Sequence, residues 1–247
     1  MIKAEYIDHM GSDLRVVNAA RVSFNKESQW DNEDERVVEL YSPETGNYYV
    51  ENPVFVPALS ERDRKLIHYL ARHDHWTPFS HCMITLRETV PIFVARQRFK
   101  HMVGFTYNEV SRRYVDDDPE FYIPDVWRKR APNKKQGSSD EPVDTPRSVD
   151  AIYRSYLSES LDAYYGLLDR GVCPEQARMV LPQSMRTSYY VTGSLAAFAR
   201  AYKLRIDPHA QKEIQDLARQ WDEIIRPMFP VSWEALVTRW EILQYTS

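Results

Sequence analysis

The side chains best suited to chemistry lie within residues 96–113, RQRFKHMVGFTYNEVSRR. Five of these residues are Lys or Arg and one, Glu109, is acidic, so five minus one gives a local charge of +4 in a chain of net charge -4. Thr106, Asn108 and Ser111 place hydroxyl and amide groups among the cations. Cations hold a phosphate, whereas amides and hydroxyls read a polar ring. We expect this segment to bind an anionic nucleotide, with a solvated cationic helix face as the alternative.

Two further arginines, Arg178 and Arg205, lie among apolar residues rather than in charged runs. A partly buried guanidinium is costly unless it is paired or holds a ligand anion. Glu175 and Asp207 are the nearby internal partners, so ligand binding and internal pairing both stay open for these two arginines.

Four of the seven histidines, His68, His73, His75 and His81, fall close together in the chain. Clustered histidines can hold a metal ion, but no CxxC or HExxH motif accompanies them. We therefore expect loop histidines that cap helices or contact ligands, and no metal site. A metal-dependent nucleotide phosphohydrolase using this cluster is kept as an alternative function.

Other common chemistries have little support. The two cysteines, Cys82 and Cys173, cannot form a disulfide scaffold or a four-thiolate zinc site, and no GxSxG elbow is present. No GxGxxG or GxxxxGK spacing occurs, so side chains and helix ends would have to hold any phosphate. Without an apolar run of roughly 18 residues or a signal core, we expect a cytoplasmic protein with no membrane partner.

The elements that must position these residues follow from the patterning of the 247-residue chain. Residues 2–7, 14–24 and 82–90 are rich in β-branched residues and predict strands, and residues 25–56 predict a loop or short hairpin. Helices are predicted after Ser60, which fits a capping box with Asp63, and after Pro91. Residues 116–147, with five prolines, are expected to form a mobile surface loop.

The C-terminal half is predicted to be mainly helical. Helices are expected from the caps Ser148, Ser194 and Ser232, and from the prolines Pro174 and Pro208. Strands first and helices later predict an α+β fold, with one domain over residues 1–247, a mixed antiparallel sheet and a mainly helical C-terminal half.

Six blocks of the chain, in order, resemble those of the flavin-dependent thymidylate synthases. They are AARVSF at 19–24, TPFSH at 77–81, VARQRFKH at 94–101, YNEVSRRY at 107–114, RMVLP at 178–182 and KLRIDPHAQ at 203–211. The resemblance implies methylation of dUMP to dTMP, with methylenetetrahydrofolate as one-carbon donor, bound FAD as redox carrier and NADPH as reductant. It also implies a homotetramer with sites shared between chains and no nucleic-acid partner. A non-catalytic nucleotide- or RNA-binding module is the remaining alternative.

The resemblance also assigns residues to the flavin. It implies flavin contacts by Thr77, Lys100, His101, Met102, Glu109 and Ser194, with His75 and Tyr114 near the flavin and folate rings. The family usually carries Arg where this chain has Ala196. Arg200, four residues later on the same helical face, is expected to restore that charge.

For the nucleotide, the resemblance implies a larger set of contacts. It places dUMP on Gln97, Arg98, Phe99, Lys100, Glu109, Val110, Ser111, Arg112, Arg113 and Arg178, with the serine and arginines on the phosphate. Arg205 would face the uracil edge and stabilise negative charge on the ring, which makes a ring carbon nucleophilic without a cysteine.

The chain departs from the family signature at one point. The family's Arg-His-Arg triplet reads Lys100, His101, Met102 here, and one extra residue near Gly104 separates the triplet from Ser111. Lys100 keeps the charge without the bidentate guanidinium, and Met102 carries no charge.

Overall fold

The computed structural model describes residues 2–41, 48–113, 118–132 and 138–244. The chain forms two compact units, Met1–His9 with Met83–Ile225 and Met10–Cys82 with Arg226–Ser247. The fold is α+β, as predicted. The assignment of one domain to residues 1–247 stays a prediction.

The first unit is built on a four-stranded sheet, in the order β1 (Lys3–Met10), β4 (Met83–Pro91), β8 (Arg186–Ser194) and β5 (Phe105–Glu109). The long strand β8 is antiparallel to both β4 and β5. Tyr189 therefore lies opposite Glu88 on one side and Glu109 on the other. Along β4 and β8 buried residues alternate with less buried ones, so each strand places one set of side chains in the core and the other on the open face.

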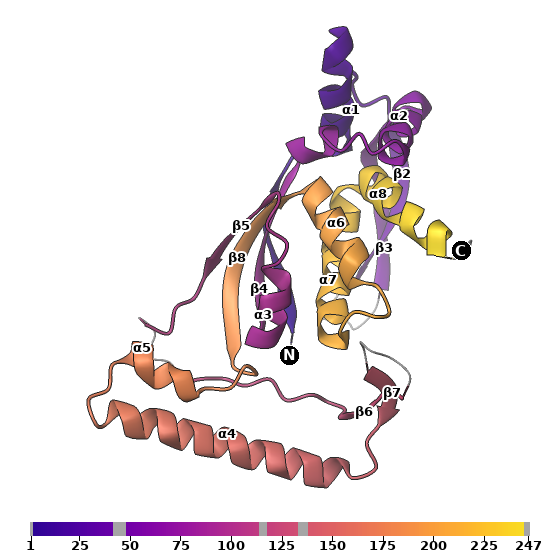
Figure 1. Cartoon of the computed structure of the whole chain (residues 1–247). Coiled ribbons are helices and arrows are strands. Elements are labelled where there is room, and N and C mark those ends of the chain that lie inside the picture. The colour runs from indigo at the N-terminus through magenta and orange to yellow at the C-terminus, as the bar shows by residue number, and fades with distance from the viewer. Residues whose placement is uncertain (1, 42–47, 114–117, 133–137, 245–247) are drawn as a thin grey trace. The chain divides into compact units, whose positions relative to one another are not determined.

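Three helices of this unit complete its core. α3 (Ile92–Arg98) follows β4 directly, α6 (Leu195–Arg205) follows β8, and α7 (Lys212–Met228) lies beside α6 (Figure 1). Phe198 of α6 joins the sheet to α7, because its ring is 4.9 Å from Phe105 and 6.2 Å from Trp221 between centroids. The turns from β4 into α3 and from β8 into α6 thus place the first residues of both helices next to the sheet.

A long helix, α4 (Pro146–Leu168), is attached to the first unit through few buried side chains, Leu157, Ser160 and Tyr164. Ser160 donates to the Val180 carbonyl in a 3₁₀ turn (Arg178–Val180) that follows α5 (Pro174–Ala177). The described parts of 116–147 contain two short antiparallel strands, β6 (Arg128–Arg130) and β7 (Ser138–Pro142), and the start of α4.

The second unit contains α1 (Asp13–Arg21), a 3₁₀ turn (Val22–Phe24), the antiparallel pair β2 (Asn32–Tyr41) and β3 (Tyr48–Ala58), α2 (Glu61–Arg72), a 3₁₀ turn (Pro78–His81) and α8 (Pro230–Gln244). Asp13 accepts the backbone N–H groups of Val231 and Ser232, each at 2.9 Å, and so ties α1 to the first turn of α8. Among the described residues, no helix combines the length and the apolar composition that a membrane crossing requires.

Several predicted elements are confirmed: the strand at 82–90, and the helices after Ser60, Pro91 and Ser194. The strand predicted at 14–24 is wrong, because α1 occupies most of it. Val16 and Val17 are consecutive and both buried, which packing between helices allows in spite of their β propensity. Ser232 does not precede the last helix but lies within α8.

Candidate functional site

A cavity of about 720 Å³ opens on the first unit, lined by β4, β5, β8, the segment after β5 and the α5 region. It brings together six of the predicted dUMP residues: Glu109, Val110, Ser111, Arg112, Arg113 and Arg178. The sequence placed these residues in two blocks far apart in the chain. The fold unites them because β5 leads directly into residues 110–113 and β8 pairs along β5.

Arginines dominate the charge of this cavity. Five arginines line it (Arg87, Arg112, Arg113, Arg178 and Arg186) against three acids (Glu109, Asp118 and Glu120). Arg186 pairs with Glu120 at 2.9 Å, and Arg113 is 3.6 Å from Glu175. Guanidinium groups bind phosphate through parallel N–H bonds, so the cavity suits a phosphorylated small molecule.

Hydroxyl groups set the directions of two charged side chains in the cavity. Ser111 Oγ accepts from Arg113 Nε at 3.2 Å, and Thr187 Oγ1 donates to Glu109 Oε1 at 2.6 Å. The cavity therefore offers both cationic donors and an oriented carboxylate. A nucleotide presents both an anion and N–H donors, so it is a chemical match for this pair of groups.

A second group of predicted residues gathers at the end of α6. Arg205 Nε donates to His101 Nε2 at 2.8 Å, and Arg205 Nη2 donates to the Gln97 carbonyl at 3.2 Å. Gln97 Nε2 also donates to Gln211 Oε1 at 2.6 Å. None of Gln97, His101 and Arg205 lines the cavity described above. Within one chain, the predicted dUMP residues thus form two separate groups, which we call the cavity group and the α6-end group.

His101 is neutral in this arrangement. Burial, and then the positive charges of Arg205, Arg98 and Arg200, lower the pKa of His101 to about 4. An arginine has no acceptor, so His101 Nε2 must be the accepting nitrogen and the ring proton must be on Nδ1. Burial and Arg98 also lower the pKa of Arg205.

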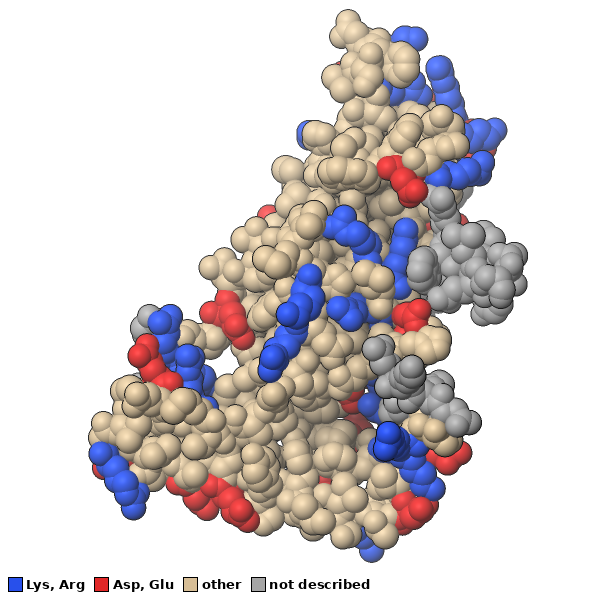
Figure 2. All heavy atoms as spheres, in the orientation of Figure 1, with Lys and Arg blue, Asp and Glu red and all other residues tan. Residues whose placement is uncertain are grey.

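Three of the predicted flavin residues, Lys100, Met102 and Arg200, are exposed on the first unit. Lys100 and Arg200 are exposed cations. Met102 and Val103, which follow Lys100 closely in the chain, each have 74% of their surface exposed. Arg200 donates to the Val103 carbonyl and so attaches α6 to this segment. Figure 2 shows Lys and Arg side chains gathered over α3 and α6. An apolar strip beside cations has the chemistry to hold a flavin ring and its pyrophosphate, so these residues fit FAD.

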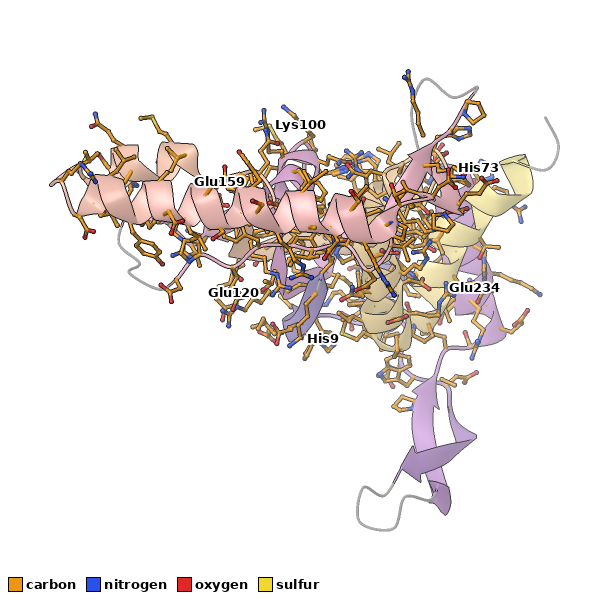
Figure 3. The ribbon with its side chains drawn as sticks, turned by 90° about the horizontal axis from the view of Figure 1, so that it is seen from below. His9, His73, Lys100, Glu120, Glu159 and Glu234 are labelled. Atoms are coloured by element: carbon orange, nitrogen blue, oxygen red, sulfur yellow. The ribbon has the colours of Figure 1, made fainter. Side chains whose placement is uncertain are left out.

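Lys100 lies apart from the cavity group. It does not line the cavity, and in Figure 3 it lies well away from Glu120, which does. Lys100 therefore belongs with the α6-end group and the exposed strip, although it was predicted to contact both ligands.

Three residues predicted as ligand contacts have other roles in this structure. Arg98 is completely buried and pairs with Glu88. Phe99 packs its ring against Tyr107 and Tyr189, with centroids at 5.0 and 4.8 Å. Ser194 is buried and caps α6, because its Oγ accepts the Ala197 N–H at 3.2 Å.

The remaining predicted flavin residues lie elsewhere. Thr77 and His75 belong to the second unit, where Thr77 precedes the 3₁₀ turn at Pro78–His81 and His75 makes an edge contact with Tyr69. Tyr114 lies outside the described residues.

The cavity also contains residues that the sequence did not single out, notably Arg87, Arg186 and Thr187. Arg87 was within a predicted strand, at a position that alternates with the buried Leu86 and Glu88. That alternation could have marked Arg87 as facing away from the core. Arg186 and Thr187 begin β8, which was not predicted although TSYYVT at 187–192 is rich in the β-branched and aromatic residues that favour strands.

Among the described residues, neither the histidine cluster nor Cys82 is arranged for the alternative chemistries. His73 and His75 have ring centroids 6.2 Å apart, but the described residues contain no group of three or more His, Cys, Asp or Glu that could hold a metal ion. Burial raises the pKa of the Cys82 thiol to about 12, so this cysteine is protonated at neutral pH and is a poor nucleophile.

Comparison with known proteins identifies relatives along almost the whole chain. Residues 5–231 match the family model described as "Thymidylate synthase complementing protein". A flavin-dependent thymidylate synthase of Thermosipho africanus is 36% identical over 94% of this chain and 89% of the relative. One of Thermus thermophilus is 35% identical over 93% and 73%. A UMP/dUMP methylase of Streptomyces cacaoi, solved with 5-bromo-dUMP, superposes with a TM-score of 0.76 at 30% identity, covering 96% of this chain and 95% of that one.

Proposed function

Because the chain belongs to the flavin-dependent thymidylate synthases, we propose that it methylates dUMP to dTMP in the cytoplasm. Methylenetetrahydrofolate is the one-carbon donor, FAD the bound redox carrier and NADPH the reductant. The observation that carries this proposal is the arginine-rich cavity, which unites Glu109, Ser111, Arg113 and Arg178 around a volume suited to a nucleotide.

The cavity group binds the nucleotide. Ser111, Arg112, Arg113 and Arg178 hold the phosphate, since guanidinium and hydroxyl donors are the groups that a phosphate accepts from. Glu109, oriented by Thr187, accepts an N–H from the nucleotide. This binding fixes the position of the uracil ring before reaction, which lowers the entropic part of the barrier.

Arg205 activates the ring. Its guanidinium stabilises the negative charge that develops on N3 and the carbonyl oxygens of uracil as the ring carbon attacks the methylene. The charge persists at neutral pH although the pKa of Arg205 is lowered, because burial moves it down from a very high ordinary value. No cysteine is required, in agreement with the buried, protonated thiol of Cys82.

The flavin surface consists of Lys100, Met102, Val103 and Arg200 in the first unit. Cations there bind the pyrophosphate, and the exposed apolar pair covers part of the ring. When bound, FAD supplies the reduction that converts the transferred methylene to a methyl group.

The two groups of dUMP residues support a homo-oligomer. The cavity group and the α6-end group are separate within one chain, yet the resemblance assigns both to one nucleotide. A homotetramer, in which one protomer supplies the cavity and its partner supplies Arg205, reconciles these two facts.

The test is an anaerobic spectrum of the purified protein with FAD, followed by addition of NADPH, dUMP and methylenetetrahydrofolate. We expect a flavin band that bleaches with NADPH, and dTMP detected by chromatography of the complete mixture. A protein that retains no flavin, or that bleaches but forms no dTMP, would contradict the proposal.

A further inference from the structure

A completely buried ion pair lies at the centre of the first unit. Glu88 of β4 and Arg98 at the end of α3 both have side chains with no exposed surface. Arg98 Nε donates to the two carboxylate oxygens of Glu88 at 3.3 and 3.1 Å. The same carboxylate accepts from Tyr189 Oη at 2.6 Å and from Trp221 Nε1 at 2.8 Å. Glu88 thus fastens the end of α3 to β8 and α7 at one point.

Aromatic rings enclose the guanidinium. Arg98 Cζ is 4.3 Å from the centre of the Phe105 ring and 4.6 Å from that of Trp221. Its Nη2 is buried with no hydrogen-bond partner among the residues that the structure describes. Cation–π contacts on these rings stabilise the charge, so the orientation of the guanidinium is held by both its carboxylate and its aromatic walls.

Tyr107 of β5 connects the Arg98 guanidinium to the α6-end group by hydrogen bonds. Arg98 Nη1 donates to Tyr107 Oη at 2.7 Å, and Tyr107 in turn donates to the His101 carbonyl at 2.7 Å. Burial raises the pKa of Tyr107 to about 12, so the phenol keeps the proton that it must donate. The Tyr107 hydroxyl therefore connects the His101 carbonyl to the Arg98 side chain, in addition to the bond that the His101 N–H donates to the Arg98 carbonyl at 3.1 Å.

The segment attached in this way is the one that holds Arg205. Two hydrogen bonds connect Arg205 to it, one to His101 Nε2 at 2.8 Å and one to the Gln97 carbonyl at 3.2 Å. A shift of the His101 backbone would move the acceptor of Arg205 Nε. A displacement of about 1 Å in a positioning group can cost on the order of a hundredfold in rate.

We propose that the Glu88–Arg98 pair, acting through the Tyr107 hydroxyl, is a positioning device that sets the direction of the Arg205 guanidinium. This inference rests on the proposed function, in which Arg205 faces the uracil ring. Glu88, Arg98 and Tyr107 touch no ligand, so they are positioning rather than catalytic residues. Replacing a buried ion pair by apolar side chains of similar volume is often neutral for stability, so a buried pair is weak evidence for a purely structural role.

The test is a double-mutant cycle on dUMP binding by the full-length protein, measured by titration calorimetry. Tyr107→Phe removes only the hydroxyl and keeps the ring, and we expect the dissociation constant of dUMP to rise about tenfold. Arg205→Ala should weaken binding at least as much. In the Arg205→Ala background, Tyr107→Phe should have no further effect, because the group that it positions is gone.

Two controls separate positioning from a general loss of structure. Tyr190→Phe removes the neighbouring hydroxyl of β8, which is on the exposed side of the strand, and should leave dUMP binding unchanged. Binding of deoxyribose 5-phosphate, which has no uracil, should be the same in Tyr107→Phe and in the wild-type protein. A loss of binding for both ligands would indicate unfolding of the site and overturn the inference.

The remaining outcomes are distinct. If the wild-type protein binds dUMP but the effects of Tyr107→Phe and Arg205→Ala are additive, the positioning role is refuted and the proposed function stands. If the wild-type protein does not bind dUMP, the proposed function itself fails. The charge-neutral double variant Glu88→Gln/Arg98→Met provides a second test, since it retains apolar packing and should reproduce the Tyr107→Phe loss.

Discussion

At the scale of single residues, Arg205 and Cys82 show how the surroundings of a side chain determine its protonation and its orientation. Both side chains could take part in uracil chemistry, one as a fixed cation and the other as a nucleophile. The thiol of Cys82 is fully buried in the second unit, and burial raises its pKa to about 12. Arg205 is only partly buried and is held by His101 and Gln97. The structure therefore argues against a Cys82 thiolate, in keeping with the proposed role of Arg205.

The first prediction concerns Arg205. Arg205→Ala should lower the rate of dTMP formation by about a hundredfold or more, because one preorganised donor to a developing charge is typically worth that much. FAD content, measured from the absorbance of the purified variant, should stay the same. Cys82→Ala and Cys173→Ala are matched controls and should retain most of the activity; a large loss in either without unfolding would point back to a covalent mechanism.

A second prediction concerns the phosphate. Arg178→Ala should raise the KM for dUMP by about tenfold to a hundredfold, which corresponds to one lost hydrogen bond to a charged group. Arg147→Ala, on the exposed face of α4, is the matched control and should leave the KM unchanged. The KM would be measured by steady-state kinetics at saturating folate and NADPH. An unchanged KM in Arg178→Ala would show that Arg178 does not bind the phosphate of dUMP.

A third prediction follows from the pKa of His101, which is lowered from 6.5 to about 4. Between these values the unfolded chain binds a proton that the folded protein does not, so stability falls as the pH is lowered from 6.5 to 4. His101→Gln keeps an acceptor for Arg205 but removes the titration. Urea unfolding across this pH range should show a smaller loss of stability in the variant, and identical pH dependences would refute the lowered pKa.

At the scale of elements, the turns from β4 into α3 and from β8 into α6 position most of the site. Pro91 precedes α3 with an extended backbone, and Ser194 caps α6. Gly104 lies close to the start of α6: a Cβ there would be 2.9 Å from Ala197 Cβ, and its φ of +81° suits only glycine. The absence of a side chain at Gly104 thus allows the segment at 100–104 to lie close beside α6.

The fourth prediction concerns the buried ion pair between Glu88 of β4 and Arg98 of α3. Arg98→Ala leaves the buried Glu88 carboxylate without its cation and should destabilise the protein by about 3–5 kcal/mol. The double variant Glu88→Gln/Arg98→Met should lose much less, because it buries no unpaired charge. Chemical denaturation would compare the two, and equal losses would show that packing rather than charge dominates there.

At the scale of the whole molecule, the proposed homo-oligomer depends on the separation of the cavity group from the α6-end group. Both groups belong to the first unit, but the residues of the α6-end group do not line the cavity. A closed homo-oligomer can bring one protomer's cavity to its partner's Arg205.

The fifth prediction is that two inactive variants complement each other. Arg178→Ala and Arg205→Ala, mixed under conditions that exchange protomers, should regain about a quarter of the wild-type activity, because a quarter of randomly paired sites carry both intact groups. Light scattering should report four chains per particle. A mixture that stays inactive after confirmed exchange would place both groups of one site on the same chain.

The sequence by itself determined the local features: the strand at 82–90 and the helices capped by Ser60 and Ser194. These depend on neighbours within a few positions, where alternation, caps and charge runs carry the signal. It also indicated the family, because six ordered blocks span most of the chain.

Only the tertiary structure decided which arginines are buried and which line the cavity. Arg98 and Arg112 lie in one basic segment, yet Arg98 is buried against Glu88 and Arg112 lines the cavity. The difference depends on β8, a strand that pairs with residues 80 to 111 positions away in the chain and supplies Tyr189 to one side of the sheet. Burial and pairing of this kind arise from contacts distant in sequence, and no local pattern at Arg98 records them.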